Sequence, residues 1–203
     1  MTAPTVSAPS TLPARPATSP PTPQEAGATL VVAFATDPVM RWLWPEADDY
    51  LAGFRALAEL MGRTACDAGT ADRSANDAGV ALWIPPDTEL PDEAVADLVE
   101  QILAPERRER LFALLTALAE LHPTDVHWYL PLIGVDPSHQ GHGHGSALLR
   151  QGARRCDRDG LPAYLEASSP RNRALYERHG FRVLGEVRVL DSPPLWPMLR
   201  APA

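Results

Sequence analysis

The amino-acid sequence predicts a mixed α/β fold in which a mixed sheet carries helices on both faces. An apolar strand at 126–135 runs into a glycine-rich loop, and this loop opens a helix that begins near Ser146. Strand-like and helix-like segments continue to alternate after this unit, as they do in sheets that are covered by helices. The 203 residues are enough for one domain with a sizeable core.

The amino-terminal segment differs in composition from the rest of the chain. Pro, Ala, Ser and Thr dominate residues 2–23, and such a segment cannot bury enough apolar surface to hold a compact core. Proline also favours an extended backbone. We therefore expect residues 1–10 to form a disordered proline-rich tail.

Two helices are expected next, over 24–36 and 49–65, because their apolar residues recur at helical spacing. Asp37-Pro38 is interpreted as the exit of the first helix. The connection between the helices contains Trp42 and Trp44. Their rings suit either packing under a loop or the lining of a ligand cleft, and the sequence does not decide between the two.

The middle of the chain predicts a hairpin and two more helices. Residues 69–84 should form the hairpin, with a polar turn at 76–79 and a buried strand at 80–84. Residues 91–122 should form the two helices, and a stripe of leucines on the second is expected to face the core.

The carboxyl-terminal part supplies the remaining elements. The helix after the glycine loop should end at Gly160, and a strand should follow at 162–167. A short helix over 170–179 has Ser169 in position to cap it, proline in its first turn and a glycine at its end. Strands at 181–189 and 195–199 complete the expected sheet.

Composition and charge exclude several classes of protein. Hydrophobic residues make up 45% of the chain and charged residues 22%, which is ordinary for a globular protein. The formal net charge of -8 and a pI near 5.2 argue against a nucleic-acid partner, which would require a basic excess. An acidic surface instead tolerates a cationic acceptor.

The expected location is the cytoplasm, with no membrane partner. No segment approaches the roughly 20 apolar residues that cross a bilayer, and the amino end lacks the pattern of a secretory signal. Cys66 and Cys156 lie far apart and outside any CxxC spacing, so no disulfide scaffold is indicated. Cys156 is expected to pack in the core.

The glycine loop has the features of a phosphate-binding loop. The amides of the first helical turn have no partner within the helix and lie at the positive end of the helix dipole. Glycines let an anion approach these amides, and the loop reads Gln140-Gly141-His142-Gly143-His144-Gly145.

Two other interpretations of this loop are weaker. Gly141-x-Gly143 followed by Glu166 imitates a dinucleotide-binding fingerprint, but its glycines lie too far beyond the strand and Ser146 replaces the third glycine. Alternatively, three histidines could hold a metal, but no nearby cysteine or carboxylate completes a set of four ligands. We therefore expect no metal at this histidine group, which consists of His139, His142 and His144.

A set of motifs resembles the GNAT acetyltransferase superfamily. The spacing of Gln140, Gly143 and Gly145 is similar to the QxxGxG loop with which that family holds the diphosphate of coenzyme A. Asn172, followed four residues later by Tyr176 and then by a Gly-Phe pair, is similar to the residues beside its pantetheine arm and thioester.

The resemblance implies a particular fold. It implies a mostly antiparallel twisted sheet of about seven strands, in which strands four and five splay apart to admit the pantetheine arm. A similarity at 11–17 to the first strand of the family places an edge strand there, so the domain would span 11–203. Pro131 fits this picture because proline provides no donor inside a strand, which must therefore bulge or part there. A harmless edge distortion is the alternative.

The resemblance also implies which residues bind acetyl coenzyme A as the cosubstrate. Main-chain groups of the strand would hold the pantetheine and supply an N–H to the oxyanion, while the loop and the short helix would hold the rest. The expected set is Ile133, Gly134, Val135, Gln140, Gly141, His142, Gly143, His144, Gly145, Ser146, Asn172 and Tyr176.

Two residues are the candidates for proton transfer. Tyr176 corresponds to the family tyrosine that protonates the leaving thiolate, although a core tyrosine bonded to a backbone carbonyl is the alternative. Glu166 lies in an otherwise apolar strand, where a carboxylate is usually paired or functional. It would act as the base or anchor the substrate ammonium, unless it faces outward.

The predicted function is N-acetylation of a small-molecule amine, which could be an antibiotic or an aminonucleoside, by direct attack in a ternary complex. A noncatalytic regulatory module, a protein N-terminal acetyltransferase and a polyamine acetyltransferase stay open. The oligomeric state is also open, with a homodimer among the alternatives. The residues expected to contact the amine are Trp42, Trp83, His127, Tyr129 and Glu166.

Overall fold

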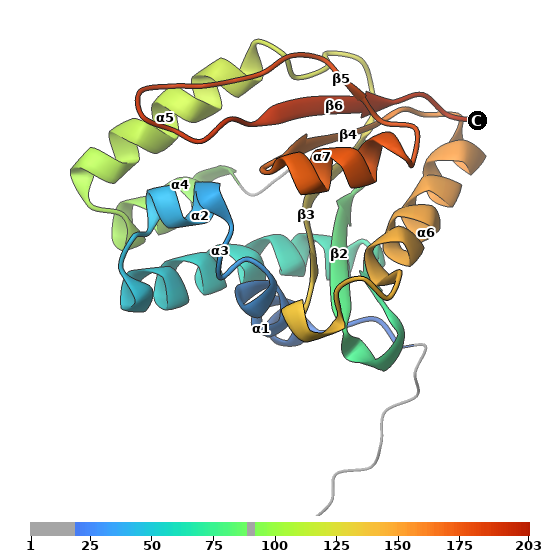
Figure 1. The fold of residues 1–203 in the computed structure, drawn as a ribbon, viewed down its shortest axis with the longest axis horizontal. Helices are drawn as coiled ribbons and strands as arrows, with labels where there is room; N and C mark the ends of the chain where they lie inside the picture. The colour runs from blue at the N-terminus through green and yellow to red at the C-terminus, as the bar shows by residue number, and fades with distance from the viewer. Residues whose placement is uncertain (1–18, 89–91) are drawn as a thin grey trace, which may run out of the picture.

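A computed structural model describes residues 19–88 and 92–203 and confirms a mixed α/β architecture (Figure 1). The expected tail at 1–10 and the expected edge strand at 11–17 lie outside the described residues. The sheet has six strands in the order β1-β2-β3-β4-β6-β5, and only the β3–β4 pair is parallel. The strands are β1 Ala71–Arg73, β2 Gly79–Ile84, β3 Trp128–Val135, β4 Ala163–Ala167, β5 Arg182–Val183 and β6 Trp196–Arg200.

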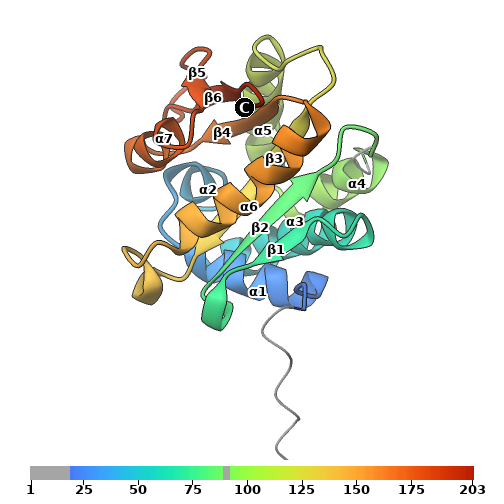
Figure 2. The ribbon, with the colours of Figure 1, turned by 90° about the vertical axis from the view of Figure 1, so that its right-hand side faces the viewer.

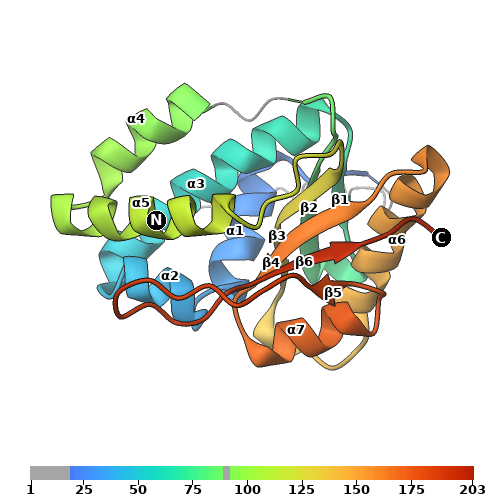
Figure 3. The same cartoon turned by 90° about the horizontal axis from the view of Figure 1, so that it is seen from above.

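Helices cover both faces of this sheet (Figure 2). One core cluster joins the sheet to α1 and α3, a second joins it to α6 and α7, and a third packs α2 and α5 against the segment before β6. Seen from above, α4 and α5 lie on the side away from α6 (Figure 3). The helices are α1 Pro23–Ala33, α2 Pro38–Leu43, α3 Ala47–Asp67, α4 Asp92–Ile102, α5 Pro105–Ala119, α6 His144–Asp159 and α7 Pro170–Glu177.

The expected connection at 39–45 is instead largely the helix α2. Asp37 starts this helix, because its Oδ1 accepts hydrogen bonds from the amides of Val39 (3.0 Å) and Met40 (3.1 Å). Pro38 occupies the first turn, where the missing N–H has no consequence. The Asp-Pro pair therefore begins a helix, although the sequence analysis interpreted it only as an end.

The strand expected over 181–189 is also shorter than predicted. Pairing in β5 stops after Val183, and further along only an isolated bridge joins Val187 to Leu195. Gly185 packs so closely on Leu121 that a Cβ there would lie 2.7 Å from the leucine Cδ1. This segment leaves the sheet because it packs against the end of the α5 region.

The parting of two adjacent strands is the feature that positions the site. Strands β3 and β4 pair only at Trp128↔Ala163 and Tyr129↔Tyr164, and beyond these pairs β3 follows β2 while β4 follows β6 (Figure 1). In the β2–β3 ladder, Leu82 pairs with Leu132 but Ile84 pairs with Tyr129, so β3 contains one extra residue. The bulge and the parting both occur at Pro131, as its lack of a donor predicts.

The contact between Gly152 and Trp83 is the tightest helix–sheet approach. A Cβ at Gly152 would lie 2.0 Å from an atom of the fully buried Trp83 ring. Gly152→Ala is therefore expected to destabilise the fold by about 1–3 kcal/mol, even though alanine favours a helix. Urea unfolding measures this change.

Gly62→Ala is the matched control in α3. Its added Cβ would come no closer than 3.4 Å to Pro23, so helix propensity should prevail and stability should rise by about 0.5–1 kcal/mol. A stabilised Gly152→Ala variant would contradict the packing described here.

Candidate functional site

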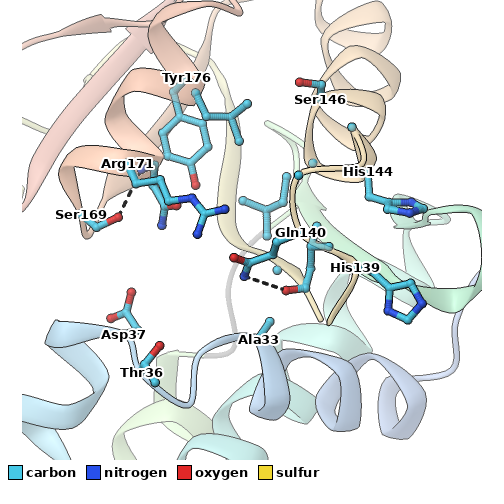
Figure 4. Close-up of a pocket in the computed structure, with 18 of the residues that line it drawn as sticks. Ala33, Thr36, Asp37, His139, Gln140, His144, Ser146, Ser169, Arg171 and Tyr176 are labelled. Atoms are coloured by element: carbon cyan, nitrogen blue, oxygen red, sulfur yellow. Dashed lines mark hydrogen bonds between the residues drawn. The ribbon is translucent and has the colours of Figure 1, made fainter. Parts of the chain in front are cut away.

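The principal cleft of ≈ 570 Å³ opens where β3 and β4 diverge. Its walls come from the end of β3, the glycine loop, α7 and the connection between α1 and α2 (Figure 4). The lining residues include Ala33, Thr36, Asp37, Ile133, Gly134, Val135, His139, Gln140, Gly141, Gly143, His144, Gly145, Ser146, Ser169, Arg171, Asn172, Leu175, Tyr176 and Arg178.

Main-chain groups of β3 face this cleft. Asp136 donates to the Ala78 carbonyl at 2.8 Å, and because hydrogen-bonded pairs alternate in an antiparallel ladder, Gly134 also bonds across to β2. The main-chain groups of Ile133 and Val135 therefore point the other way, toward the gap. Gln140 Nε2 donates to the Val135 carbonyl at 3.2 Å, which leaves the Ile133 groups and the Val135 N–H for a ligand.

Gly134 thus has a different role from the one expected of it. Its main-chain groups form hydrogen bonds to β2 in the antiparallel ladder, so Gly134 lines the cleft without offering a free donor to a ligand. A Cβ there would lie 2.6 Å from the Ala33 Cβ, and the glycine is what lets α1 approach the strand.

The glycine loop presents the start of α6 to the cleft. Gly141 and Gly143 have φ values of +83° and +86°, in the left-handed region that favours glycine. The first bond of α6 runs from the Ala147 amide to the Gly143 carbonyl at 3.0 Å. The amides of His144, Gly145 and Ser146 therefore belong to the first turn and have no acceptor within the helix.

Side chains of the loop point in different directions. His139 and His144 lie on the far side of the loop from Tyr176 (Figure 4). The His142 ring nitrogen lies 3.2 Å from the His139 carbonyl, and His142 does not line the cleft, while Ser146 Oγ lies 3.0 Å from His179 Nε2. No group of three potential metal ligands occurs in the part of the chain that the structure describes.

Helix α7 places Asn172 and Tyr176 along the opposite wall. Ser169 caps the helix as expected, accepting a hydrogen bond from the Asn172 amide at 3.2 Å. The Tyr176 ring is buried, and its hydroxyl points into the cleft toward Asp37 (Figure 4). Burial, and secondarily the charge of Asp37, raises the pKa of Tyr176, so the phenol stays protonated at neutral pH.

Glu166 lies on β4 just beyond the last residue paired with β3. It is partly buried, and Tyr129 donates a hydrogen bond of 3.1 Å to its Oε2. Burial raises the pKa of Glu166 to about 7, although hydrogen bonds from Tyr164 and Tyr129 act in the opposite direction. Such a carboxyl group exchanges its proton near neutral pH.

His127 and Tyr129 do not line the principal cleft. They line a second cavity of ≈ 1130 Å³ at the other end of β3, next to α4. Tyr129 reaches from that cavity to Glu166, so the second cavity ends beside the same carboxylate.

The two tryptophans expected to contact the amine line neither cavity. Trp83 is fully buried against α6 and has no surface left for a substrate, so its assignment to the substrate site is corrected to core packing. Trp42 donates to Asp191 at 3.0 Å and lies under the Arg110 guanidinium, so it fastens α2 to α5 and to the loop before β6. Trp44 is buried against Gly53.

Sequence reasoning missed several lining residues. Asp37 is buried at the foot of the cleft, where Ser168 donates a hydrogen bond to it and burial raises its pKa. Arg171 extends its guanidinium across the cleft (Figure 4). A cation next to Asn172 on the first turn of α7 was the available signal for Arg171, whereas nothing local indicated that Asp37 would face Tyr176.

Comparisons with known proteins agree with this arrangement. Residues 80–181 match the model of the Acetyltransferase (GNAT) family. An uncharacterised N-acetyltransferase of Schizosaccharomyces pombe is 30% identical over 198 residues, covering 88% of this chain and 79% of that protein.

Solved structures show the same architecture. A Corynebacterium glutamicum structure, described as histone acetyltransferase HPA2 and related acetyltransferase, has a TM-score of 0.65 and 34% identity over 88% of this chain and 90% of its own. Arylalkylamine N-acetyltransferase 2 of Aedes aegypti has a TM-score of 0.64 with 18% identity, over 88% of this chain and 94% of its own. The second likeness concerns the fold alone.

Proposed function

The chain belongs to the GNAT family of N-acetyltransferases, which use acetyl coenzyme A as cosubstrate, and from this premise we propose that it acetylates the primary amine of a small molecule. The parting of β3 from β4 carries the proposal. It leaves the main-chain groups of Ile133 and the N–H of Val135 free in a cleft, with a protonated Tyr176 on one wall and Glu166 on the strand that diverges. Within residues 19–88 and 92–203, none of the helices has the length and hydropathy of a membrane span.

The residues of the cleft fit coenzyme A. The amides of residues 144–146 and the positive-φ glycines form a cradle for a diphosphate. A Cβ at Gly145 would lie 3.4 Å from Leu175, so the fold itself tolerates alanine there, and the absent side chain leaves room for a ligand. Arg171 adds a positive charge to the same cleft, and the free groups of Ile133 together with the Val135 N–H match the amides of a pantetheine arm.

The chemistry follows from the placement of the two ionisable groups. Acetyl coenzyme A supplies an activated acyl group when bound. Glu166 accepts a proton from the substrate ammonium, and the neutral amine then attacks the thioester carbonyl. Its pKa of about 7 allows Glu166 to be ionised at neutral pH and still exchange protons. The Ile133 or Val135 N–H donates to the developing oxyanion, and Tyr176 donates its phenolic proton to the departing sulfur.

A resemblance in several motifs bears on the identity of the amine that is acetylated. The motifs between Trp128 and Asn172, together with Pro194-x-Trp196-x-Met198, resemble puromycin N-acetyltransferase within the family. This resemblance favours an aminonucleoside or antibiotic amine. A noncatalytic coenzyme-binding module is the alternative, and the elevated pKa of Glu166 beside the parting favours the enzyme.

An acetylation assay with an amine panel tests the proposed function. Thiol release from acetyl coenzyme A and the acetylated product are measured together for puromycin, tryptamine, 1,4-diaminobutane and a peptide with a free α-amine. The chain contains no lysine, so it offers no side-chain amine as a self-acceptor and the background is low. Tight coenzyme binding without turnover of any amine would establish the noncatalytic alternative.

Gly143→Val is expected to weaken coenzyme A binding by at least about 10-fold, because a β-branched residue cannot keep the left-handed conformation that forms the cradle. Calorimetric titration measures this affinity. Gly160→Val is the matched control, since Gly160 has a φ of +67° at the opposite end of α6 and a Cβ there also meets nothing within 4 Å. Equal losses of affinity in both variants would mean that strain in α6, rather than the cradle, causes the effect.

A further inference from the structure

The second cavity has features that the acetyl donor does not require. It measures ≈ 1130 Å³ and lies between the end of β2, the first turns of α4 and the segment that precedes β3. We call it the vestibule. Its polar and aromatic lining residues are Glu93, Asp97, His122, Asp125, His127 and Tyr129.

The inner end of the vestibule reaches the reaction centre. Tyr129 lines the vestibule and donates to Glu166 at 3.1 Å, so a single side chain separates the vestibule from the carboxylate. Tyr164 is fully buried beneath the His122 ring, with ring centroids 4.4 Å apart, and its hydroxyl acts with that of Tyr129 on the Glu166 carboxylate.

The outer part of the vestibule is negatively charged. Glu93 and Asp97 lie one turn apart on α4, on the same face, and Asp125 lies across from them on the vestibule wall. None of these three carboxylates makes an ion pair within residues 19–88 and 92–203, and no arginine lines the vestibule. Burial and the neighbouring His127 lower the pKa of His122, so that imidazole adds no positive charge at neutral pH.

These observations separate the entrances of the two substrates. The principal cleft contains the phosphate cradle and Arg171, which suit an anionic donor. The vestibule contains unpaired carboxylates and aromatic rings, which attract organic cations. The end of β3 lines the principal cleft, and Tyr129 near its start lines the vestibule. A donor and an acceptor can therefore approach the parting of β3 and β4 from opposite sides.

We propose that the vestibule admits the acceptor and selects primary amines that carry a second positive charge away from the reacting nitrogen. The reacting end passes Tyr129 to reach Glu166, while the distal charge stays among Glu93, Asp97 and Asp125. This inference rests on the proposed acetyltransferase function and adds to it the chemical class of the amine.

The experiment compares 1,4-diaminobutane with pentylamine, which replaces the distal ammonium by a methyl group of similar size. The enzyme is expected to prefer the diamine by about 10-fold in kcat/KM, as one well-placed charge contact provides. In the double variant Glu93→Gln, Asp97→Asn, kcat/KM for the diamine should fall by about 10-fold, with pentylamine changed less than about 2-fold.

The control variant is Glu106→Gln, Glu109→Gln, which removes the same charge from an exposed part of α5 and should leave both amines unaffected. Equal kcat/KM values for the two amines, or a preference that survives in the vestibule variant, would overturn the proposal.

Calorimetry separates a failure of the chemistry from a failure of the vestibule. If no amine is acetylated, saturable binding of 1,4-diaminobutane that the vestibule variant loses would support the vestibule and reject the proposed function alone. Absence of binding to the unmodified protein would overturn the vestibule.

Discussion

Replacing Glu166 by Gln is expected to lower kcat by roughly 10²–10⁴-fold while the affinity for acetyl coenzyme A stays unchanged. The amide keeps the shape of the side chain and its contact with Tyr129, but it cannot accept the proton that the substrate ammonium must lose before the amine attacks. Steady-state kinetics and calorimetry on the same preparation measure the two quantities. Turnover within about 2-fold of the unmodified enzyme would remove Glu166 from the base role.

The pH dependence of kcat gives a second test of the same residue. Glu166 must be ionised to act as the base, so activity should rise with pH through an apparent pKa of about 7. Tyr129→Phe removes a hydrogen bond that favours the carboxylate, and the rise should therefore move to higher pH. Glu166→Gln should lack this rise. An unshifted profile in Tyr129→Phe would show that another group controls it.

The free energy of unfolding should also depend on pH through the ionisation of Glu166. Folding raises the pKa of Glu166 from 4.5 to about 7, so the folded protein binds this proton more tightly than the unfolded chain does. Ionisation then destabilises the fold, and the destabilisation grows between these two pKa values and is complete above pH 7. Relative to the unmodified protein, Glu166→Gln should gain stability from about pH 5 to about pH 8.

Tyr176→Phe is expected to reduce kcat by roughly 10²–10⁴-fold with coenzyme binding nearly unchanged. The ring continues to fill its buried place on α7, so the variant loses only the hydroxyl that points into the cleft. The reason is chemical: without the phenolic proton, the thiolate leaves unprotonated. Steady-state kinetics measures the expected loss in kcat, and the dissociation constant for coenzyme A measures the expected retention of binding.

Tyr50→Phe is the appropriate control for this substitution. Tyr50 is also buried, but its hydroxyl donates to the Val31 carbonyl at 2.7 Å in the α1–α3 core. Its loss should lower stability by about 1 kcal/mol without affecting kcat. If both variants lost activity in proportion to their stability, the acid role of Tyr176 would be refuted.

Much of the principal cleft could be predicted because its signals are local. The strand, the glycine loop and α6 follow one another directly in the chain. Ser169 starts α7 through its side chain, and Gly160 ends α6 through its left-handed backbone. Pro131 predicted the bulge because a missing donor has the same effect in any context.

The remaining features depend on contacts between distant segments. Every residue of β2 is buried, so its sequence shows no alternation of apolar and polar residues. The face of the sheet that Trp83 occupies depends instead on the pairing of β2 with its neighbours, which places the ring against α6. The vestibule combines residues near 84–97 with residues near 122–129, and no local pattern joins them. The hydrogen bond from Ser168 to Asp37 likewise joins segments that lie 131 residues apart in the chain.

The most direct test of the central claim is a crystal structure of the complex with coenzyme A. The account predicts that the diphosphate lies within hydrogen-bonding distance of amides in the segment 141–146. It also predicts that the pantetheine arm pairs with Ile133 and Val135 and ends near Tyr176. A diphosphate bound elsewhere, or β3 and β4 closed against each other along their whole length, would contradict it.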